Sequence, residues 1–133
     1  MSKRFVLSSA FFSVAVVALI VTTAAPALAV KEFRDAFKSK YVKPDSTDAN
    51  DVALAAAVDQ TSCGICHVGE NRKIRNDYGK QLAKLIKKTD KKNKDKIFKA
   101  MDTVAKMKSK PADSKSPTFG DNIASGKLPF QKQ

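Results

Sequence analysis

The sequence is poor in the residues that bind metal ions most directly. Its 133 residues include two cysteines and one histidine. A structural zinc site needs four ligands, which usually come from a second pair of cysteines or histidines. Because the chain has no further residue of either type to complete such a set, its composition argues against a zinc-binding protein.

Alternating strands are also scarce. No convincing alternation of apolar and polar residues precedes Thr61 or follows Glu70, so the strand-turn-helix setting of a thioredoxin-like dithiol is not expected. Cys63 and Cys66 lie so close in the chain that a disulfide between them would close too small a loop to add much stability. A redox dithiol and a structural disulfide are therefore the weaker explanations of this pair.

The two cysteines and the histidine lie together in the run Cys63-Gly64-Ile65-Cys66-His67. In a C-x-x-C-H run the two thiols are spaced to add across the two vinyl groups of a haem. The adjacent histidine is placed to bind the iron as its proximal ligand. The sequence therefore predicts one haem c per chain, held by Cys63, Cys66 and His67.

Residues 1–29 have the features of a secretory signal peptide. Lys3 and Arg4 form a positive start, an apolar stretch follows, and residues 27–29 (Ala-Leu-Ala) form a small-x-small cleavage site. We expect cleavage and export to the periplasm or an equivalent compartment outside the cytoplasmic membrane, where bacteria attach haem covalently. An uncleaved membrane anchor is the alternative, because an apolar stretch of about 17 residues is at the lower limit for a spanning helix.

Most of the remaining chain has helical periodicity. The segments expected to be helical are 30–42 with Phe33, Phe37 and Tyr41 on one face, the alanine-rich 51–59, 78–88 with Tyr78, Leu82, Leu85 and Ile86, and 97–110 with Ile97, Met101, Val104 and Ala105. Asp48 or Asn50 is expected to cap the second segment. The predicted fold is all-α, with about four short helices and no strands, packed around one covalently attached haem in a cytochrome c-like manner.

The predicted haem-binding domain covers residues 30–110. Residues 111–133 are rich in Pro, Gly, Ser and Lys and are expected to form an irregular C-terminal tail. A short helical turn from Thr118, with Phe119 and Ile123 on one side, is the only regular structure expected there.

The chain resembles the c-type cytochromes. CGICH after a short helical lead-in, in an exported chain of this size, is typical of that family. The stretches RNDYGK (75–80), TFGDNI (118–123) and GKLP (126–129) are similar to segments of small single-haem proteins exported by planctomycete bacteria. The resemblance implies haem binding and one-electron transfer between redox partners, carried by Cys63, Cys66 and His67.

The sixth iron ligand is less clearly marked. In class I cytochromes c a methionine on a loop usually supplies it, and a long C-terminal helix follows. Met107 is the better candidate here, because it lies about 60° beyond Val104 on a helical wheel, close to the end of the fourth segment. Met101 is the runner-up, since a methionine within an apolar stripe is more often core packing than a ligand. A broken tail follows Met107 in place of a long helix, so an open sixth position or a ligand other than methionine is the third alternative.

The sixth position separates two functions. A methionine thioether raises the reduction potential and suits an electron carrier. An open position would admit peroxide or a gas, as in a sensor or a peroxidase-like enzyme. The sequence has no second histidine and no evident distal acid-base pair for peroxide cleavage, so an electron carrier is favoured over an enzyme.

Acidic residues are outnumbered by basic ones, 13 against 25, which gives a net charge of +12. A cationic surface suits an acidic redox partner protein or an anionic membrane surface. It also suits nucleic acid, but export and the lack of a recognised binding motif argue against that class. Eight lysines lie within residues 84–99, interrupted by Asp90 and Asp95. Runs of this kind are more often solvated surface than docking sites.

Overall fold

The computed structural model describes residues 31–61, 63–69 and 71–130, and within them the chain is mainly helical. The helices are α1 (Lys31–Tyr41), α2 (Ala49–Thr61), α3 (Asp77–Leu85), α4 (Lys94–Ala105) and α5 (Phe119–Ala124), with a 3-10 turn η1 (Lys88–Lys92). Two short strands, β1 (His67–Val68) and β2 (Asn71–Arg75), form an antiparallel hairpin. The predicted leader lies outside the described residues, and none of the described helices is long and apolar enough to cross a membrane.

The predominantly helical class is confirmed, but the expectation of a chain without strands is wrong. β1 and β2 pair His67 with Arg75 and Val68 with Asn71. Gly69, between them, has a φ of 57°, which glycine adopts readily because it has no Cβ. The hairpin is too short to be predicted from a run of alternating apolar and polar residues.

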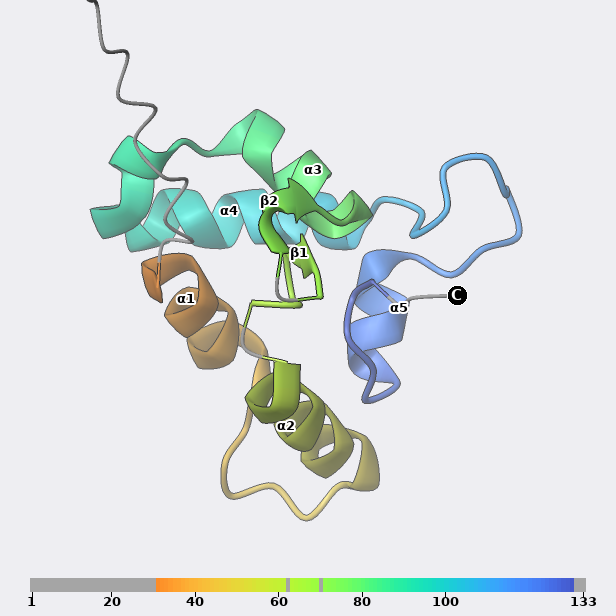
Figure 1. The fold of residues 1–133 in the computed structure, drawn as a ribbon. Helices are drawn as coiled ribbons and strands as arrows, with labels where there is room; N and C mark the ends of the chain where they lie inside the picture. Colours follow the sequence, from red (N-terminus) through yellow and green to blue (C-terminus); the bar gives the residue numbers. More distant parts are fainter. Residues whose placement is uncertain (1–30, 62, 70, 131–133) are drawn as a thin grey trace, which may run out of the picture.

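The hairpin and the turn before it lie in the middle of the helices. In Figure 1 α3 and α4 lie above this segment, α1 to its left, α2 below it and α5 to its right. α4 packs against α1, α3 and α5, while α2 contacts α5. The buried residues of α4 are Ile97, Ala100, Met101 and Val104. The apolar stripe predicted for this helix is therefore the face that it turns to the core.

α1 contributes an aromatic face to the same core, as its periodicity predicts. Phe37 is buried, and Phe33 and Tyr41 pack against the core while partly buried. The ring of Phe37 lies 4.9 Å from that of Tyr41 and 6.1 Å from that of Tyr78, centre to centre. Tyr78 lies 5.4 Å from Phe119. One row of aromatic rings thus joins α1, α3 and α5.

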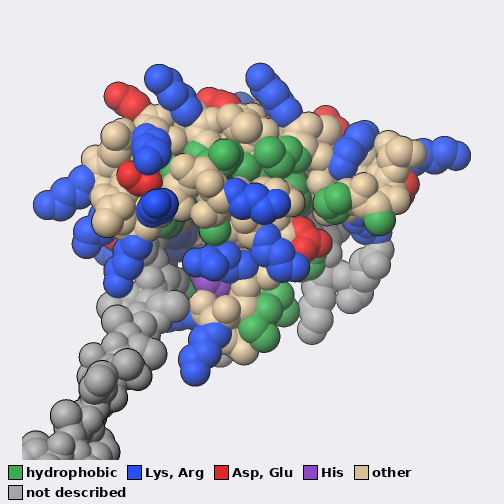
Figure 2. All heavy atoms as spheres, turned by 90° about the horizontal axis from the view of Figure 1, so that it is seen from above, with side chains coloured by type: hydrophobic (Ala, Val, Ile, Leu, Met, Phe, Trp, Pro, Cys, Tyr) green, Lys and Arg blue, Asp and Glu red, His purple; other side chains and the backbone are tan. Residues whose placement is uncertain are grey.

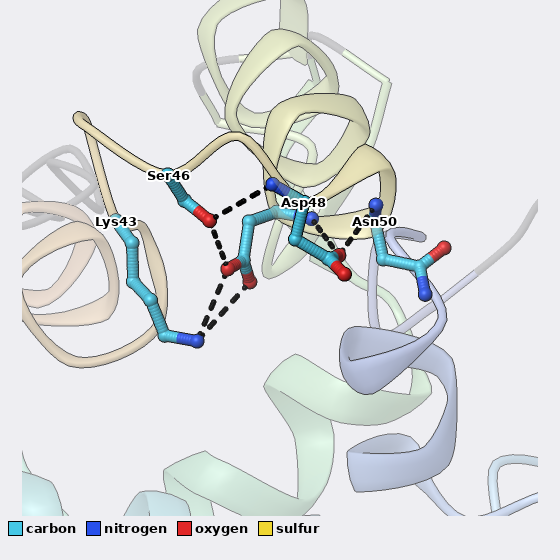
Figure 3. Close-up of polar contacts among 5 residues, drawn as sticks. Lys43, Ser46, Asp48 and Asn50 are labelled. Carbon is cyan, nitrogen blue, oxygen red and sulfur yellow. Dashed lines mark hydrogen bonds and ion pairs between the residues drawn. The ribbon is translucent and has the colours of Figure 1, made fainter.

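Asp48 caps the start of α2, so of the two expected caps it is the one used. Its carboxylate accepts hydrogen bonds from the backbone N–H groups of Asn50 at 2.8 Å and Asp51 at 3.2 Å. The carboxylate of Asp51 accepts from the Ser46 hydroxyl at 2.6 Å and from the Lys43 ammonium at 3.1 Å (Figure 3). These hydrogen bonds, that of Ser46 foremost, lower the pKa of Asp51. The network sets the first residue of α2.

α3 and α4 end earlier than their periodicity suggests. α3 ends at Leu85, which is 39% exposed, and the next residue, Ile86, is buried. α4 ends at Ala105 and does not continue to Lys110. Beyond Ala105 the chain turns back, and an isolated bridge pairs residue 108 with 118. Competition from this long-range pairing, which no local pattern shows, ends the helix.

The segment 119–130 packs on the rest of the domain. The expected helical turn from Thr118 is confirmed as α5, with Phe119 and Ile123 buried. Thr118 and Asp121 form a capping box at its start: the Asp121 N–H donates to the Thr118 hydroxyl oxygen at 3.0 Å, and the Thr118 N–H donates to the Asp121 carboxylate at 2.8 Å. The C-terminal segment therefore contributes to the core that surrounds the C-x-x-C-H turn.

Candidate functional site

The residues 63–67 form a tight turn directly after α2. The N–H of Gly64 donates to the carbonyl of Thr61 at 2.8 Å. The N–H groups of Cys66 and His67 donate to the carbonyl of Cys63 at 3.3 and 3.1 Å. A Cβ at Gly64 would lie 1.9 Å from Cγ2 of Thr61, so a larger residue here would require the Thr61 side chain to move. The three site residues predicted from the sequence thus belong to one turn of backbone held by its own hydrogen bonds.

Cys63 and Cys66 are partly exposed free thiols. Burial of its sulfur raises the pKa of Cys66 to about 12, although the positive charge of Arg75 opposes this shift. A redox-active dithiol needs a lowered pKa, because the reactive form is the thiolate. The surroundings of Cys66 therefore disfavour a redox dithiol. They suit a sulfur that becomes a neutral thioether.

His67 is partly buried, and its Nδ1 atom is buried without a hydrogen-bond partner among the described residues. Burial is the main cause that lowers the pKa of His67; a hydrogen bond with the backbone of Ile74 opposes it, and the charges of Arg75 and Arg72 lower the pKa further. The net shift favours the neutral imidazole, which is the form that binds metals. A buried ring nitrogen without a partner costs free energy unless another group takes it. Both features fit an iron ligand.

Asn76 holds this turn from the start of α3. Its side chain is buried, with 1% exposed. The amide group donates hydrogen bonds to the carbonyls of Gly64 at 2.9 Å and Ile65 at 3.1 Å. The side-chain oxygen accepts from the N–H of Gly79 at 2.9 Å, which caps α3. One side chain therefore closes the first turn of α3 and ties that helix to the C-x-x-C-H turn.

Gly79 allows α3 to approach the turn closely. The backbone N–H of Asn76 donates to the carbonyl of Cys66 at 3.0 Å. A Cβ on Gly79 would lie 2.0 Å from that same carbonyl oxygen. No side chain fits at this distance, so the first turn of α3 can rest on the Cys66 backbone only with glycine at this position.

Two tyrosine hydroxyls are buried nearby without hydrogen-bond partners among the described residues, those of Tyr41 and Tyr78. Burial raises the pKa of Tyr41 to about 12 and that of Tyr78 well above its ordinary value. Both hydroxyls are therefore neutral hydrogen-bond donors at physiological pH. Buried donors without an acceptor are exceptional in folded proteins. They fit a site whose acceptor belongs to a bound group.

The two candidate methionines lie in different surroundings. Met101 is 1% exposed inside α4, where core packing alone accounts for it. Met107 lies beyond the end of α4 and is partly buried against the core. Its N–H donates to the Val104 carbonyl, and its carbonyl accepts from the Phe119 N–H, both at 2.9 Å. The backbone of Met107 is thus fixed at the point where the chain turns back. Its role as sixth ligand stays a prediction.

Asn76 and Gly79 are not among the site residues predicted from the sequence. The capping role of Asn76 could have been predicted, since asparagine directly before an apolar-periodic segment is typical of a helix N-cap. Nothing in the local pattern indicates that the asparagine amide also reaches carbonyls 11 and 12 residues earlier. The contact depends on tertiary packing.

In the described part of the chain, no group of three or more His, Cys, Asp and Glu side chains is placed to hold a metal ion. Comparisons with family models, with curated proteins and with solved structures find no match for this chain. The function is therefore argued from the site.

Proposed function

We propose that the chain is an exported c-type cytochrome. It carries one haem c attached by thioether bonds to Cys63 and Cys66, with His67 as an axial ligand of the iron. It passes one electron at a time between redox partners. The observation that supports this most is that one hydrogen-bonded turn contains both thiols and the histidine. The pKa of Cys66 is raised, and the Nδ1 atom of His67 is buried without a hydrogen-bond partner among the described residues.

The donor set of the chain fits a haem better than a bare metal ion. A haem supplies four nitrogen ligands of its own, so the protein has to provide only axial ligands. One histidine in the right place is then sufficient. When bound, the haem supplies an iron atom that takes up and releases one electron.

The two cysteines are sufficient for covalent attachment of a haem. Cys63 and Cys66 would each form a carbon–sulfur bond to one vinyl carbon, while the thiol hydrogen goes to the other vinyl carbon. This addition needs no oxidant or reductant. The thioether that results is neutral, which agrees with the buried position that raises the pKa of Cys66.

Other residues of this chain would orient the ligand and keep water away. Asn76 and Gly79 hold the backbone of the turn, and so direct His67. The hydroxyls of Tyr41 and Tyr78 are buried donors that suit the carboxylates of a haem. The aromatic row on α1, α3 and α5 would provide an apolar wall.

We propose Met107 as the sixth ligand, with Met101 as the runner-up. If Met107 binds the iron, the oxidised protein has the weak sulfur-to-iron absorption band at the red end of its spectrum. Met107→Ala removes that band. Met101→Ala keeps it and mainly destabilises the fold, by about 2–5 kcal/mol, because it empties a buried site.

The opposite pattern in these two variants would transfer the ligand to Met101. Absence of the band from the wild-type protein would mean an open position. The alternative function, a small-molecule sensor or a peroxidase-like enzyme, would then replace the electron carrier.

The partner in this proposal is an acidic redox protein outside the cytoplasmic membrane, and an anionic membrane surface is the second candidate. The proposal is tested by spectra of the oxidised and reduced protein, with His67→Ala alongside. The wild-type protein should change reversibly between two haem spectra. His67→Ala should alter the ligand state of the iron and lower haem incorporation, because the chain has no other histidine. A wild-type protein without a haem spectrum would exclude the proposed function.

A further inference from the structure

The hairpin that follows the C-x-x-C-H turn presents an unusual set of side chains. All residues of β2 are exposed, and they include Arg72, Lys73 and Arg75. Ile74, between them, is 52% exposed, and Val68 on β1 is 36% exposed. We call these five residues (Val68, Arg72, Lys73, Ile74 and Arg75) the hairpin surface. Two exposed aliphatic side chains among three cations are the composition of a small interface, apolar at its centre and charged at its rim.

The cations of the hairpin surface are not neutralised within the described domain. None of Arg72, Lys73 and Arg75 forms an ion pair with another described residue. In the lysine run of residues 84–99, Lys96 lies 2.9 Å from the Asp90 carboxylate and Lys91 lies 3.9 Å from Glu32, while the other six lysines also form no ion pair with a described residue. Both surfaces therefore offer cations to an acidic partner. The hairpin surface differs from the run in its two exposed aliphatic side chains and in its position next to His67.

The hairpin surface is connected directly to the candidate iron ligand. β1 begins at His67, which pairs with Arg75 across the hairpin. Asn76, the residue after β2, is hydrogen-bonded to the turn that carries the two thiols. Figure 2, which views the molecule from above Figure 1, shows Lys and Arg side chains spread over that side, with fewer Asp and Glu between them. A partner seated here would lie next to the redox centre of the proposed cytochrome.

We propose that the hairpin surface, and not the lysine run of residues 84–99, is where an acidic redox protein docks. This inference rests on the proposed function, because docking at the hairpin surface matters only if His67 holds a redox centre; the electron would then have a short path through His67. The hairpin surface is small, which suits the brief encounters of electron-transfer proteins, since their interfaces are at the low end of the size range. A membrane is the less suitable occupant, because surface binding typically uses a cluster of four to eight cations or a helix with exposed aromatic residues.

The first test uses a probe that needs no electron transfer. Poly-L-glutamate is titrated into the isotope-labelled full-length protein as purified, and the backbone amide shifts are followed by NMR. The largest shifts should fall on residues 68–75. Shifts centred on residues 88–96, or spread evenly over all the cationic surface, would overturn the proposal. This map is measurable whether or not the haem is covalent, so its failure is distinct from failure of the proposed function.

The second test compares two variants with equal loss of charge. Arg72→Gln with Lys73→Gln alters the hairpin surface, and Lys88→Gln with Lys92→Gln alters two exposed lysines of η1. Reduced protein is mixed with hexacyanoferrate(III), which is an anion. We expect the hairpin variant to react about tenfold more slowly at 0.01 M salt and about twofold more slowly at 0.15 M, because the Debye length falls from about 30 Å to about 8 Å. The η1 variant should lose less than about threefold at either salt.

Two controls complete the comparison. With hexaammineruthenium(III), a cationic one-electron oxidant of the same reduced protein, the hairpin variant should react faster than wild type. Equal slowing of both variants with hexacyanoferrate(III) would overturn the proposal. Sedimentation with phosphatidylglycerol vesicles addresses the membrane: loss of vesicle binding in the hairpin variant with unchanged binding of poly-L-glutamate would contradict a protein partner.

Discussion

Asn76 and Asn93 are the N-caps of α3 and α4, but their side chains make different contacts. Each side-chain oxygen accepts from a backbone N–H three residues later, Asn76 from Gly79 at 2.9 Å and Asn93 from Lys96 at 3.0 Å. Asn93 is exposed, and capping is its described role. Asn76 is buried and its amide also donates to the carbonyls of Gly64, Ile65 and His67 in the C-x-x-C-H turn. The same local motif therefore starts a helix in both cases, and the buried one also holds the candidate site.

The residues three positions further on repeat the contrast. At α4 this position is Lys96, a long exposed side chain, and at α3 it is Gly79, where even a Cβ would meet the Cys66 carbonyl oxygen. An exposed helix start accepts nearly any residue at this position. A helix start that packs on a functional loop accepts only what the loop leaves room for.

The largest difference is expected between Gly79→Ala and Lys96→Ala. Alanine favours a helix over glycine by about 1 kcal/mol, so any loss from Gly79→Ala reports the clash with Cys66. We expect a net loss of about 3 kcal/mol in the free energy of unfolding, together with reduced haem incorporation. Lys96→Ala should stay within about 0.5 kcal/mol of wild type. Urea unfolding measures both. Equal stability of the two variants would mean that α3 does not rest on the turn as described.

The next largest difference is expected between Asn76→Asp and Asn93→Asp. Aspartate keeps the capping oxygen in both helices, but at residue 76 it replaces the donor amide with an oxygen that faces the carbonyls of Gly64 and Ile65. We expect Asn76→Asp to lose about 2–3 kcal/mol, because buried acceptors lose their donor. Asn93→Asp should be neutral or stabilise by up to about 1 kcal/mol, since a negative charge suits a helix N-terminus.

Haem incorporation shows whether Asn76 positions the C-x-x-C-H turn or only stabilises the fold. Asn76→Asp should bind haem less completely than a variant of equal stability that is altered in the core at the first turn of α4, such as Ile97→Ala. If both incorporate haem equally, Asn76 supports the fold alone and does not position the site.

The smallest effect is expected at the start of α5, where Asp121 is the charged residue of the capping box. Hydrogen bonds from the Thr118 N–H and hydroxyl lower the pKa of Asp121 below its ordinary value of 3.8. The unfolded chain therefore binds the proton first as the pH falls, so the stability from Asp121 is present above pH 3.8 and is lost through the lower folded pKa. Asp121→Asn should lower the melting temperature slightly at pH 7 and match wild type near about pH 2, so that the fall in melting temperature between about pH 5 and about pH 2 becomes shallower. An unchanged acid limb would show that the capping box adds no pH-dependent stability.

The sequence was sufficient where the decisive information is local. C-x-x-C-H fits in five consecutive residues, and the structure keeps them in one turn. The faces of α1 and α4 follow from the spacing of Phe33, Phe37 and Tyr41 and of Ile97, Met101 and Val104, because a helix that packs on one side must bury a stripe. These predictions needed no knowledge of distant parts of the chain.

The features that the sequence did not predict depend on pairing with other parts of the chain or on elements too short to show periodicity. The end of α4 depends on the bridge between residues 108 and 118. The hairpin has only two paired positions, so periodicity cannot show it. The second role of Asn76 depends on carbonyls of a turn that precedes it in the chain. Leu85 belonged to an apolar stripe but lies exposed at the end of α3, since the helix ends there.

The most direct test of the central claim is extraction of the purified protein with acidified acetone, followed by an absorption spectrum of the polypeptide. Non-covalent haem leaves the protein under these conditions, whereas thioether-linked haem remains. We expect haem to stay with the wild-type chain and to be released from Cys63→Ser with Cys66→Ser. Haem that extracts freely from the wild-type protein, or a wild-type protein that carries no haem when produced with an intact attachment system, would show that the chain is not a c-type cytochrome.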